Sequence, residues 1–302
     1  MWRPWKRPLN SDLPGIPNVS FSVRSVKELE DAGRQVLLSL AANISWMWYN
    51  YAWAEGHPFN DRRVREALSI AIDRESIGTG LYAGQTTPAC CYWVVEGNVG
   101  YPGDVAPSPY DPERAQQLLK DAGYEGMELK LYTFSGDADF ADQPGLTEAI
   151  AGYFEAIGLK PTVKVVDAPV LRETFSTATK DQAQIDAAIA QQPPYQLAVR
   201  GSDTRPHSYR GSQIFYHSQG RWQLMKDPAI FDPILDDAAN AFSLEEQHEA
   251  MADFHRTLAN DYWVAPLLEA GAVFGASAKV QEWQPITGKP YPHNHWTIRP
   301  PQ

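Results

Sequence analysis

Residues 58–74 read PFNDRRVREALSIAIDR, and no other stretch of the chain indicates its secondary structure so clearly. Asn60 or Asp61 can cap a helix, because the side-chain oxygen of either residue can accept a hydrogen bond from a first-turn amide. The apolar residues that follow recur at the spacing of one helical face: Val64, Ala67, Leu68, Ala71 and Ile72. The stretch therefore predicts an amphipathic helix over residues 62–74.

Residues 110–124 read YDPERAQQLLKDAGY and predict a second helix of the same kind. Asp111 stands at the N-cap, Pro112 at the first helical position, and Gly123 can adopt the left-handed conformation that ends a helix. The intervening residues 84–110 are rich in Gly and Pro and show no periodicity. They predict a long ordered loop, and long loops in compact domains often bind ligands.

The remaining segments alternate between strand-like and helical patterns. Ser243 and Glu246 form a capping box, which opens the last of the helices. We expect strands at 36–40, 44–53, 127–134, 161–166, 185–190 and 266–276, and helices at 26–34, 144–157, 170–180 and 243–260, with a polar connecting stretch at 191–222. This alternation predicts an α/β fold, a mixed sheet flanked by crossover helices.

The composition argues against several kinds of partner. The 302 residues include 37 acidic and 26 basic side chains, and the net charge of -11 repels the phosphates of nucleic acids. No apolar stretch approaches the roughly 20 residues that span a bilayer, and residues 1–17 lack the apolar core of a secretory signal. Cys90 and Cys91 are adjacent, so they are either two free thiols or a strained vicinal disulfide, which leaves the compartment open.

The two helical stretches, 58–74 and 110–124, occur in the order and with the kind of loop found in one family of proteins. Together with Thr87-Pro88-Ala89 and the weaker match at residues 215–218, they resemble the peptide/nickel class, family 5, of extracellular solute-binding proteins. The resemblance covers roughly residues 26–290. It implies a periplasmic-binding-protein-like type II lobe in an α/β fold, and a ligand enclosed between two lobes.

The same resemblance implies how the chain is divided. Residues 44–274 would form the second, inserted lobe with its hinge strands near 44–51 and 264–274. Residues 1–43 and 275–302 would belong to the first lobe, most of which, with the signal sequence, is missing from this chain. In the full-length parent protein we therefore expect a periplasmic or membrane-anchored extracellular location, and no signal peptide in this chain.

The implied function is that of a receptor, not an enzyme. The family supplies the substrate-binding component of ABC importers, so we expect a monomer that binds a peptide-like or other small organic solute and delivers it to membrane permease subunits. No cofactor and no nucleic acid are expected. Two alternatives stay open: a ligand-sensing domain of a regulator with the same fold, and a carbohydrate-active enzyme.

Polar candidates for ligand contact come from the turn that, in the family, follows a strand like 185–190. Asp203 matches the family's acidic residue, which pairs with the amino terminus of a peptide, although the matching Trp is absent here. Arg200 and Arg205 suit an anionic group, since a guanidinium binds a carboxylate with two hydrogen bonds. His207 lies in the same segment. A surface aspartate and ordinary solvated arginines are the alternative interpretations.

Aromatic candidates for ligand contact occur both before and after the helix expected at 62–74. Strand alternation places Trp46 and Trp48 on one face and Met47 and Tyr49 on the other, so one face could stack on a ligand or pack into the core. Weaker candidates of the same kind are Trp93, in the long loop, and Tyr195.

No metal site is expected from the histidines. His248 and His255 are seven residues apart on one helix, which places them about 10 Å apart along its axis, too far to share a zinc ion. The glycine and serine motifs of nucleotide-binding and hydrolase sites do not occur either.

Overall fold

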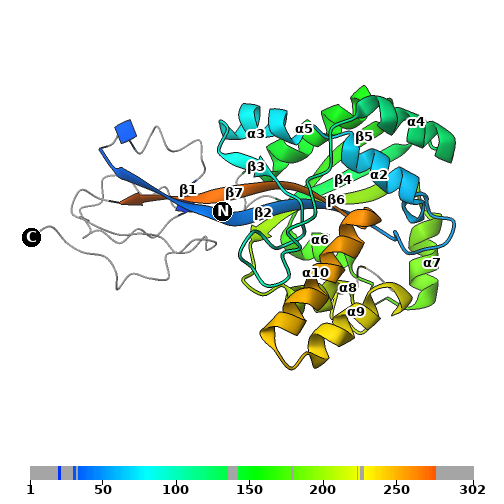
Figure 1. Ribbon diagram of the computed structural model, residues 1–302. Helices are drawn as coiled ribbons and strands as arrows, with labels where there is room; N and C mark the ends of the chain where they lie inside the picture. The colour runs from blue at the N-terminus through cyan, green and yellow to red at the C-terminus, as the bar shows by residue number, and fades with distance from the viewer. Residues whose placement is uncertain are drawn as a thin grey trace, which may run out of the picture.

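The computed structural model describes residues 20–21, 30–31, 33–134, 142–177, 180–222, 224 and 228–276. Its centre is a seven-stranded sheet with the order β1-β7-β2-β6-β4-β5, in which β3 also pairs with β7. Helices cover both faces of this sheet (Figure 1). The strands are β1 (Ser20–Phe21), β2 (Gln35–Tyr49), β3 (Thr86–Pro88), β4 (Glu128–Phe134), β5 (Lys160–Val166), β6 (Tyr195–Asp203) and β7 (Val264–Ala276).

The helices form two groups that lie on opposite faces of the sheet. A short 3-10 turn, η2 (Pro58–Asn60), precedes the first of them. The helices are α2 (Arg62–Ile70), α3 (Arg74–Tyr82), α4 (Pro112–Ala122), α5 (Gln143–Ala156), α6 (Ala168–Phe175), α7 (Gln182–Ala190), α8 (Tyr209–Tyr216), α9 (Pro228–Asn240) and α10 (Leu244–Asn260).

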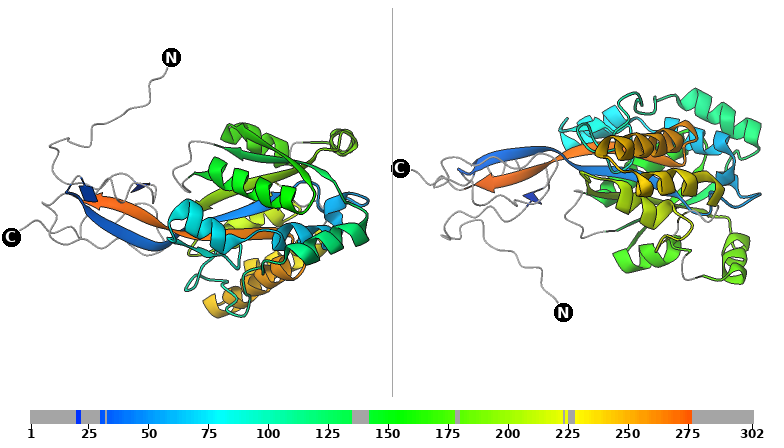
Figure 2. Two further views of the ribbon diagram at one scale, coloured as in Figure 1. Left: turned by 90° about the horizontal axis from the view of Figure 1, so that it is seen from above. Right: turned by 60° about the horizontal axis from the view of Figure 1, so that its bottom comes forward.

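Strands β2 and β7 form a long antiparallel ribbon that continues beyond the helical body and carries β1 (Figures 1 and 2). On the other side of β2, β6 is antiparallel to it, whereas β6, β4 and β5 run parallel to one another. The fold is therefore a mixed α/β sheet, as the alternating sequence pattern predicts.

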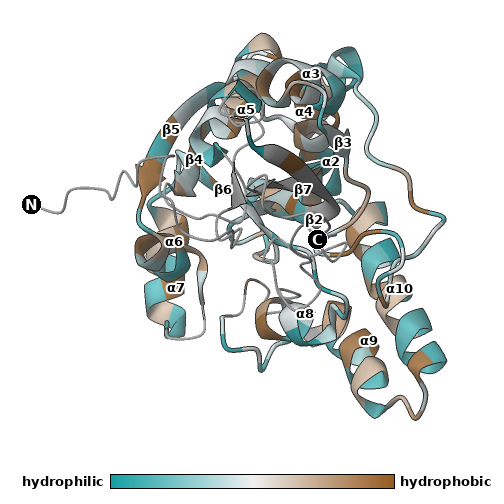
Figure 3. Cartoon of the chain, turned by 90° about the vertical axis from the view of Figure 1, so that its left-hand side faces the viewer, coloured by the Kyte–Doolittle hydropathy of each residue, from teal (hydrophilic) through white to brown (hydrophobic). Residues whose placement is uncertain are grey.

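The alternation expected along β2 is confirmed, and it divides the core in two. Met47 and Tyr49 pack with residues of α2, α3, α4 and α5 on one face of the sheet. Trp46 and Trp48 pack on the opposite face with residues of α6, α8, α9 and α10. Seen along the ribbon, α6 and α8 lie on either side of the space beneath β6 (Figure 3).

Most helices begin and end at the capping residues that the sequence predicts. The side chain of Asp111 accepts a hydrogen bond from the Arg114 amide, and Gly123 has a φ of 80° at the end of α4. Ser243 and Glu246 form the expected capping box of α10. The first helix is shorter than predicted, because Asp73 caps a new helix, α3, three residues after α2 ends.

The prediction of a strand at 185–190 is wrong, since these residues lie in helix α7. Its start is fixed by a capping box between Asp181 and Gln184, and a short, mostly apolar segment cannot be assigned by periodicity alone. The strand of this region is β6, which begins at Tyr195. Helices α8 and α9 were not expected either: Tyr209–Tyr216 and Pro228–Asn240.

Other expected bounds need smaller corrections. The strands expected at 36–40 and 44–53 are one strand that ends at Tyr49, and the helix expected to reach residue 180 ends at Phe175. In the long loop, residues 86–88 form β3. Of the helix expected at 26–34, residues 26–29 and 32 lie outside the described residues, as does the tail from 277.

Candidate functional site

The carboxyl ends of the three parallel strands lie at one edge of the sheet. They are Phe134 in β4, Val166 in β5 and Asp203 in β6. Arg200 stands opposite Trp46 of β2, close to this edge. In open α/β sheets ligands bind outside the carboxyl ends of the strands, so this edge is where a binding site is expected.

Asp203 is the last residue of β6 and not part of a turn after a strand at 185–190, which corrects the expected setting of this residue. Its carboxylate accepts a hydrogen bond from the Ser202 hydroxyl at 3.0 Å and forms an ion pair with Nη2 of Arg205 at 3.0 Å. The side chains of Asp203 and Arg205 therefore neutralise each other. A ligand ammonium at Asp203 would share this carboxylate with Arg205.

Arg205 is held in place from a second side. Its guanidinium lies 5.4 Å from the centroid of the Trp93 ring, and its backbone amide donates to the Trp93 carbonyl at 3.0 Å. Since Trp93 belongs to the long loop, these contacts fasten that loop to the end of β6. The structure thus brings Asp203, Arg205 and Trp93 together.

His207 and Tyr195 lie away from this group. Nε2 of His207 is 2.7 Å from Oε1 of Gln247 in α10, a contact between the segment after β6 and that helix. Tyr195 begins β6, at the end opposite to Asp203, and its ring packs against His57 and Phe59 at centroid distances of 5.3 and 6.1 Å. Neither residue is brought together with Asp203.

The tryptophans form a buried cluster. Trp46 is fully buried, and its ring centroid lies 5.6 Å from that of Trp48 and 5.7 Å from that of Trp93. Aromatic core packing therefore describes Trp46 and Trp93. Trp48 is also buried, yet it lines a pocket.

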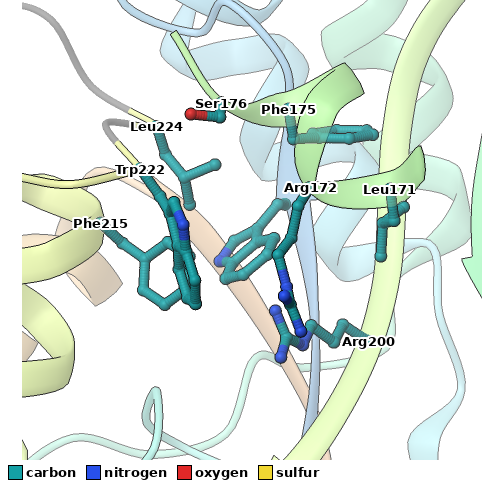
Figure 4. Close-up of a pocket in the computed structure, with 9 residues that line it drawn as sticks. Leu171, Arg172, Phe175, Ser176, Arg200, Phe215, Trp222 and Leu224 are labelled. Atoms are coloured by element: carbon teal, nitrogen blue, oxygen red, sulfur yellow. The ribbon is translucent and has the colours of Figure 1, made fainter. Parts of the chain in front are cut away.

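That pocket lies on the α6 side of the sheet and is small, with a cavity volume of about 10 Å³ (Figure 4). Two arginines from different elements contribute to it, Arg200 of β6 and Arg172 of α6. The other lining residues are mostly apolar or aromatic: Trp48, Leu171, Phe175, Ser176, Phe215, Trp222 and Leu224.

Each arginine of the pocket stands over aromatic rings. The guanidinium carbon of Arg172 lies 5.2 Å from the centroid of the Trp222 ring, and that of Arg200 lies 5.5 Å from Trp48 and 5.9 Å from Phe134. These distances fall within the range of attraction between a cation and a ring face. The pocket therefore combines positive charge with an apolar lining.

Sequence reasoning named Arg200 and Trp48 but missed the residues of α6 and α8 in the pocket. Leu171 and Phe175 stand four residues apart, a helical spacing that predicts burial of one face of α6. No local signal places Arg172 beside Arg200, because the two residues meet only when α6 packs against the sheet.

The histidines and cysteines that the structure describes do not group into a metal centre. Nδ1 of His248 accepts from the Gly100 amide at 3.1 Å, while Nε2 of His255 is 3.2 Å from the Ser208 hydroxyl. Cys90 and Cys91 are buried free thiols. Within the part of the chain that the structure describes, no group of three or more His, Cys, Asp or Glu residues could hold a metal ion.

Comparison with known proteins identifies the family. Residues 20–219 match the model of the bacterial extracellular solute-binding proteins, family 5 Middle. The chain belongs to this family. It is a family of binding proteins and not an enzyme class, and its members are periplasmic or extracellular. Among the described residues no helix has the length and apolar character needed to cross a membrane.

Individual relatives agree with this assignment. The glutathione-binding protein GsiB of Salmonella choleraesuis is 34% identical over 112 residues, which are 37% of this chain and 21% of GsiB. Solved structures share the fold. The ABC transporter substrate-binding protein CtaP of Listeria monocytogenes matches 91% of this chain and 54% of its own, with a TM-score of 0.73 and 17% identity. The periplasmic binding protein DppA of Helicobacter pylori, in complex with the peptide STSA, matches 95% of this chain and 53% of its own, with a TM-score of 0.73 and 19% identity. The chain thus spans about half the length of these solved structures.

Proposed function

We propose that this chain is the ligand-binding lobe of the solute receptor of an ABC importer, and that it binds a peptide-like or other small organic solute for delivery to a membrane permease. The observation that carries the proposal is the pocket of Arg172 and Arg200 near the carboxyl edge of the sheet, in a chain of a binding-protein family. Glutathione and peptides, the ligands named for two relatives, carry carboxylates, which guanidinium groups bind well.

The long ribbon of β2 and β7 supports the proposed division of the chain. Residues 44–274 form the second lobe, and β2 and β7 act as the hinge strands that leave it side by side. Residues 1–43 and 275–302 belong to the first lobe, which the rest of a longer protein completes. The ligand is enclosed between the two lobes, so this chain alone binds it with low affinity. The complete receptor acts as a monomer outside the cytoplasm.

A titration followed by nuclear magnetic resonance tests this function, because it detects weak binding. The ¹⁵N-labelled chain is titrated with short peptides, glutathione and a nickel–histidine chelate. We expect at least one of these ligands to shift the indole N–H resonances of Trp48 and Trp222, which line the pocket. The indole of Trp263, which stacks on Arg65, serves as the internal control. If none of the three ligand classes shifts any resonance, the proposal is wrong.

A further inference from the structure

Cys90 and Cys91 are adjacent in the long loop, and the chain has no other cysteine. Both are free thiols, with exposed fractions of only 7% and 2%. They lie in a small cluster with Val94, against which Tyr101 and Val105 pack. The two thiols are hydrogen-bonded to each other, so their sulfur atoms lie close together and are placed to react as a pair.

The two thiols differ in reactivity. Hydrogen bonds from Cys91 and from Tyr101 lower the pKa of Cys90, whereas the hydrogen bond to Cys90 and burial raise the pKa of Cys91. Cys90 is also the less buried of the two. Because the thiolate is the nucleophile, a small oxidant should react first with Cys90, and Cys91 is then in position to attack the product.

Both sides of the pair are bonded to the sheet. The amide of Ala89 donates to the carbonyl of Leu267 in β7 at 3.1 Å, and the carbonyl of Trp93 accepts from the amide of Arg205 at 3.0 Å. Only Tyr92 separates the pair from Trp93. A change in the backbone of the pair therefore acts directly on one of these two attachments.

A disulfide between the two cysteines would require such a change. The Cα atoms of neighbouring residues are about 3.8 Å apart across a trans peptide, whereas those of a disulfide are usually about 4.4 to 6.8 Å apart. Of the two attachments, Trp93 is the weaker, because its φ of 64° is unfavourable for a residue with a bulky side chain. Ala89, in contrast, directly follows the ladder between β3 and β7. Trp93 should therefore move when the disulfide forms.

We propose that Cys90 and Cys91 are a redox-active pair, which peroxide oxidises to a vicinal disulfide, and that the disulfide displaces Trp93 from Arg205. The Cys90 thiolate first attacks one oxygen of hydrogen peroxide: an S–O bond forms, the O–O bond breaks and hydroxide leaves. The sulfur of Cys91 then attacks the sulfenic acid of Cys90: the S–S bond forms, the S–O bond breaks, and the oxygen leaves as water with the thiol proton. In total two thiols and one peroxide give one disulfide and two waters, and two electrons pass from sulfur to oxygen.

The setting of the pair gives the reaction a consequence. Members of this family are periplasmic or extracellular, where disulfides persist. A strained disulfide is reduced more easily than an ordinary one, so the oxidation should be reversible. Arg205 pairs with Asp203 at the carboxyl end of β6, so displacement of Trp93 changes the edge of the sheet where a ligand is expected. The inference goes beyond the proposed solute-binding function and does not depend on it.

Mass spectrometry of the complete chain measures the oxidation. The chain is reduced, freed of reductant and treated with one equivalent of hydrogen peroxide at neutral pH. Cleavage after Lys and Arg gives a single peptide, residues 75–114, that contains both cysteines. We expect this peptide to lose two hydrogens, the protein to stay a single chain, and dithiothreitol to restore both thiols.

Nuclear magnetic resonance of the same samples measures the displacement. The indole N–H resonance of Trp93 should shift with the loss of the two hydrogens and return on reduction. The indole of Trp263, which stacks on Arg65, should not shift and is the internal control. The double variant Cys90→Ala/Cys91→Ala is the matched control, because any shift that peroxide causes in it arises at other residues, such as the methionines.

Two single variants assign the roles of the thiols. In Cys91→Ala the reaction should stop at the sulfenic acid of Cys90, which dimedone traps, because no second thiol is left to displace the oxygen. In Cys90→Ala the remaining thiol should react with peroxide more slowly than Cys90 does in Cys91→Ala, since burial raises the pKa of Cys91. An unshifted Trp263 resonance shows that each variant is folded.

Four results overturn the inference: thiols that survive peroxide until the chain is unfolded, oxygen added separately to each cysteine, a disulfide that links two chains, or an internal disulfide that leaves the Trp93 resonance unshifted. Solute binding is measured on the reduced chain. A chain that binds no solute therefore leaves this test intact, and a pair that is not oxidised leaves the proposed function intact.

Discussion

Nε of Arg74 donates a 2.9 Å hydrogen bond to the carbonyl oxygen of Pro266, which lies 192 residues further along the chain. The same guanidinium donates from Nη1 to the carbonyls of Ser69 and Ile72, at 3.0 and 3.1 Å. Burial lowers the pKa of Arg74 to about 10, so the side chain is still charged at neutral pH. The end of the motif at 58–74 is thus bonded to strand β7.

Replacing Arg74 with methionine should destabilise the protein by about 3 kcal/mol, since it leaves buried carbonyl oxygens without donors. Urea denaturation followed by circular dichroism measures the loss. Arg63→Met is the matched control, because Arg63 is exposed on the neighbouring helix and pairs with Asp61 in solvent. Its substitution should change the free energy of unfolding far less. Equal losses for the two variants would contradict a structural role for the Arg74 contacts.

Two helical glycines should respond to alanine with opposite signs. A Cβ at Gly211 in α8 would overlap the ring of Trp93, so Gly211→Ala forces a shift in the tryptophan cluster and should cost about 1 to 3 kcal/mol. A Cβ at Gly152 in α5 would meet nothing within 4 Å, and alanine favours helix there by up to about 1 kcal/mol.

Thermal unfolding of the two glycine variants provides the measurement. Gly152→Ala should raise the midpoint and Gly211→Ala should lower it. A raised midpoint for Gly211→Ala would show that α8 does not pack on the long loop as the structure has it, and a lowered midpoint for Gly152→Ala would contradict the open space beside Gly152 in α5.

The sequence predicts best those features of the fold that depend on residues close together in the chain. The caps at Asp111 and Ser243 involve residues three positions apart, and both were predicted correctly. The run at 185–190 fits a strand or a helix by its length, and the capping box between Asp181 and Gln184 decides for a helix.

Most of the candidate site cannot be predicted from the sequence, because its residues lie far apart along the chain. Arg172 and Arg200 are 28 positions apart and come from a helix and a strand, and they meet only because β6 lies next to β2 with α6 packed against that face. The pairing of Asp203 with Arg205 is local and could have been anticipated. It occupies the carboxylate that, from the family resemblance, was expected to pair with the amino terminus of a peptide.

The contribution of one residue of β7 to stability should fall between pH 4.5 and 7. Burial, with a contribution from Glu96, raises the pKa of Glu269 from 4.5 to about 7. In this range Glu269 keeps a proton in the folded protein that it releases in the unfolded chain, so its contribution to the free energy of unfolding decreases as the pH rises. Glu269→Gln should remove this decrease, and Glu128→Gln, at an exposed position in β4, should not. Urea midpoints across the range measure the effect, and an unchanged slope in Glu269→Gln would refute it.

Two buried histidines should have the opposite effect to Glu269, because they make the protein less stable as the pH falls. Burial lowers the pKa of His57 to about 4 and that of His255 to about 3, from 6.5 in both cases. Below pH 6.5 the unfolded chain therefore binds protons that the folded protein does not, and stability decreases as the pH falls. The histidine C2–H resonances check this directly, since those of His57 and His255 should not titrate between pH 5 and 8. A titration midpoint near 6.5 for either residue would show that it is not buried as described.

The adjacent thiols of Cys90 and Cys91 should differ in reactivity. A hydrogen bond from Cys91 and another from Tyr101 lower the pKa of Cys90, whereas the hydrogen bond to Cys90 and burial raise the pKa of Cys91. Because the thiolate is the reactive form, iodoacetamide should alkylate Cys90 first, and both thiols quickly once the protein is unfolded. Cys91→Ala removes the stronger of the two hydrogen bonds, so it should slow the labelling of Cys90 at neutral pH. Mass spectrometry of labelled peptides distinguishes the sites, and a mass two hydrogens lower before labelling would instead indicate a vicinal disulfide.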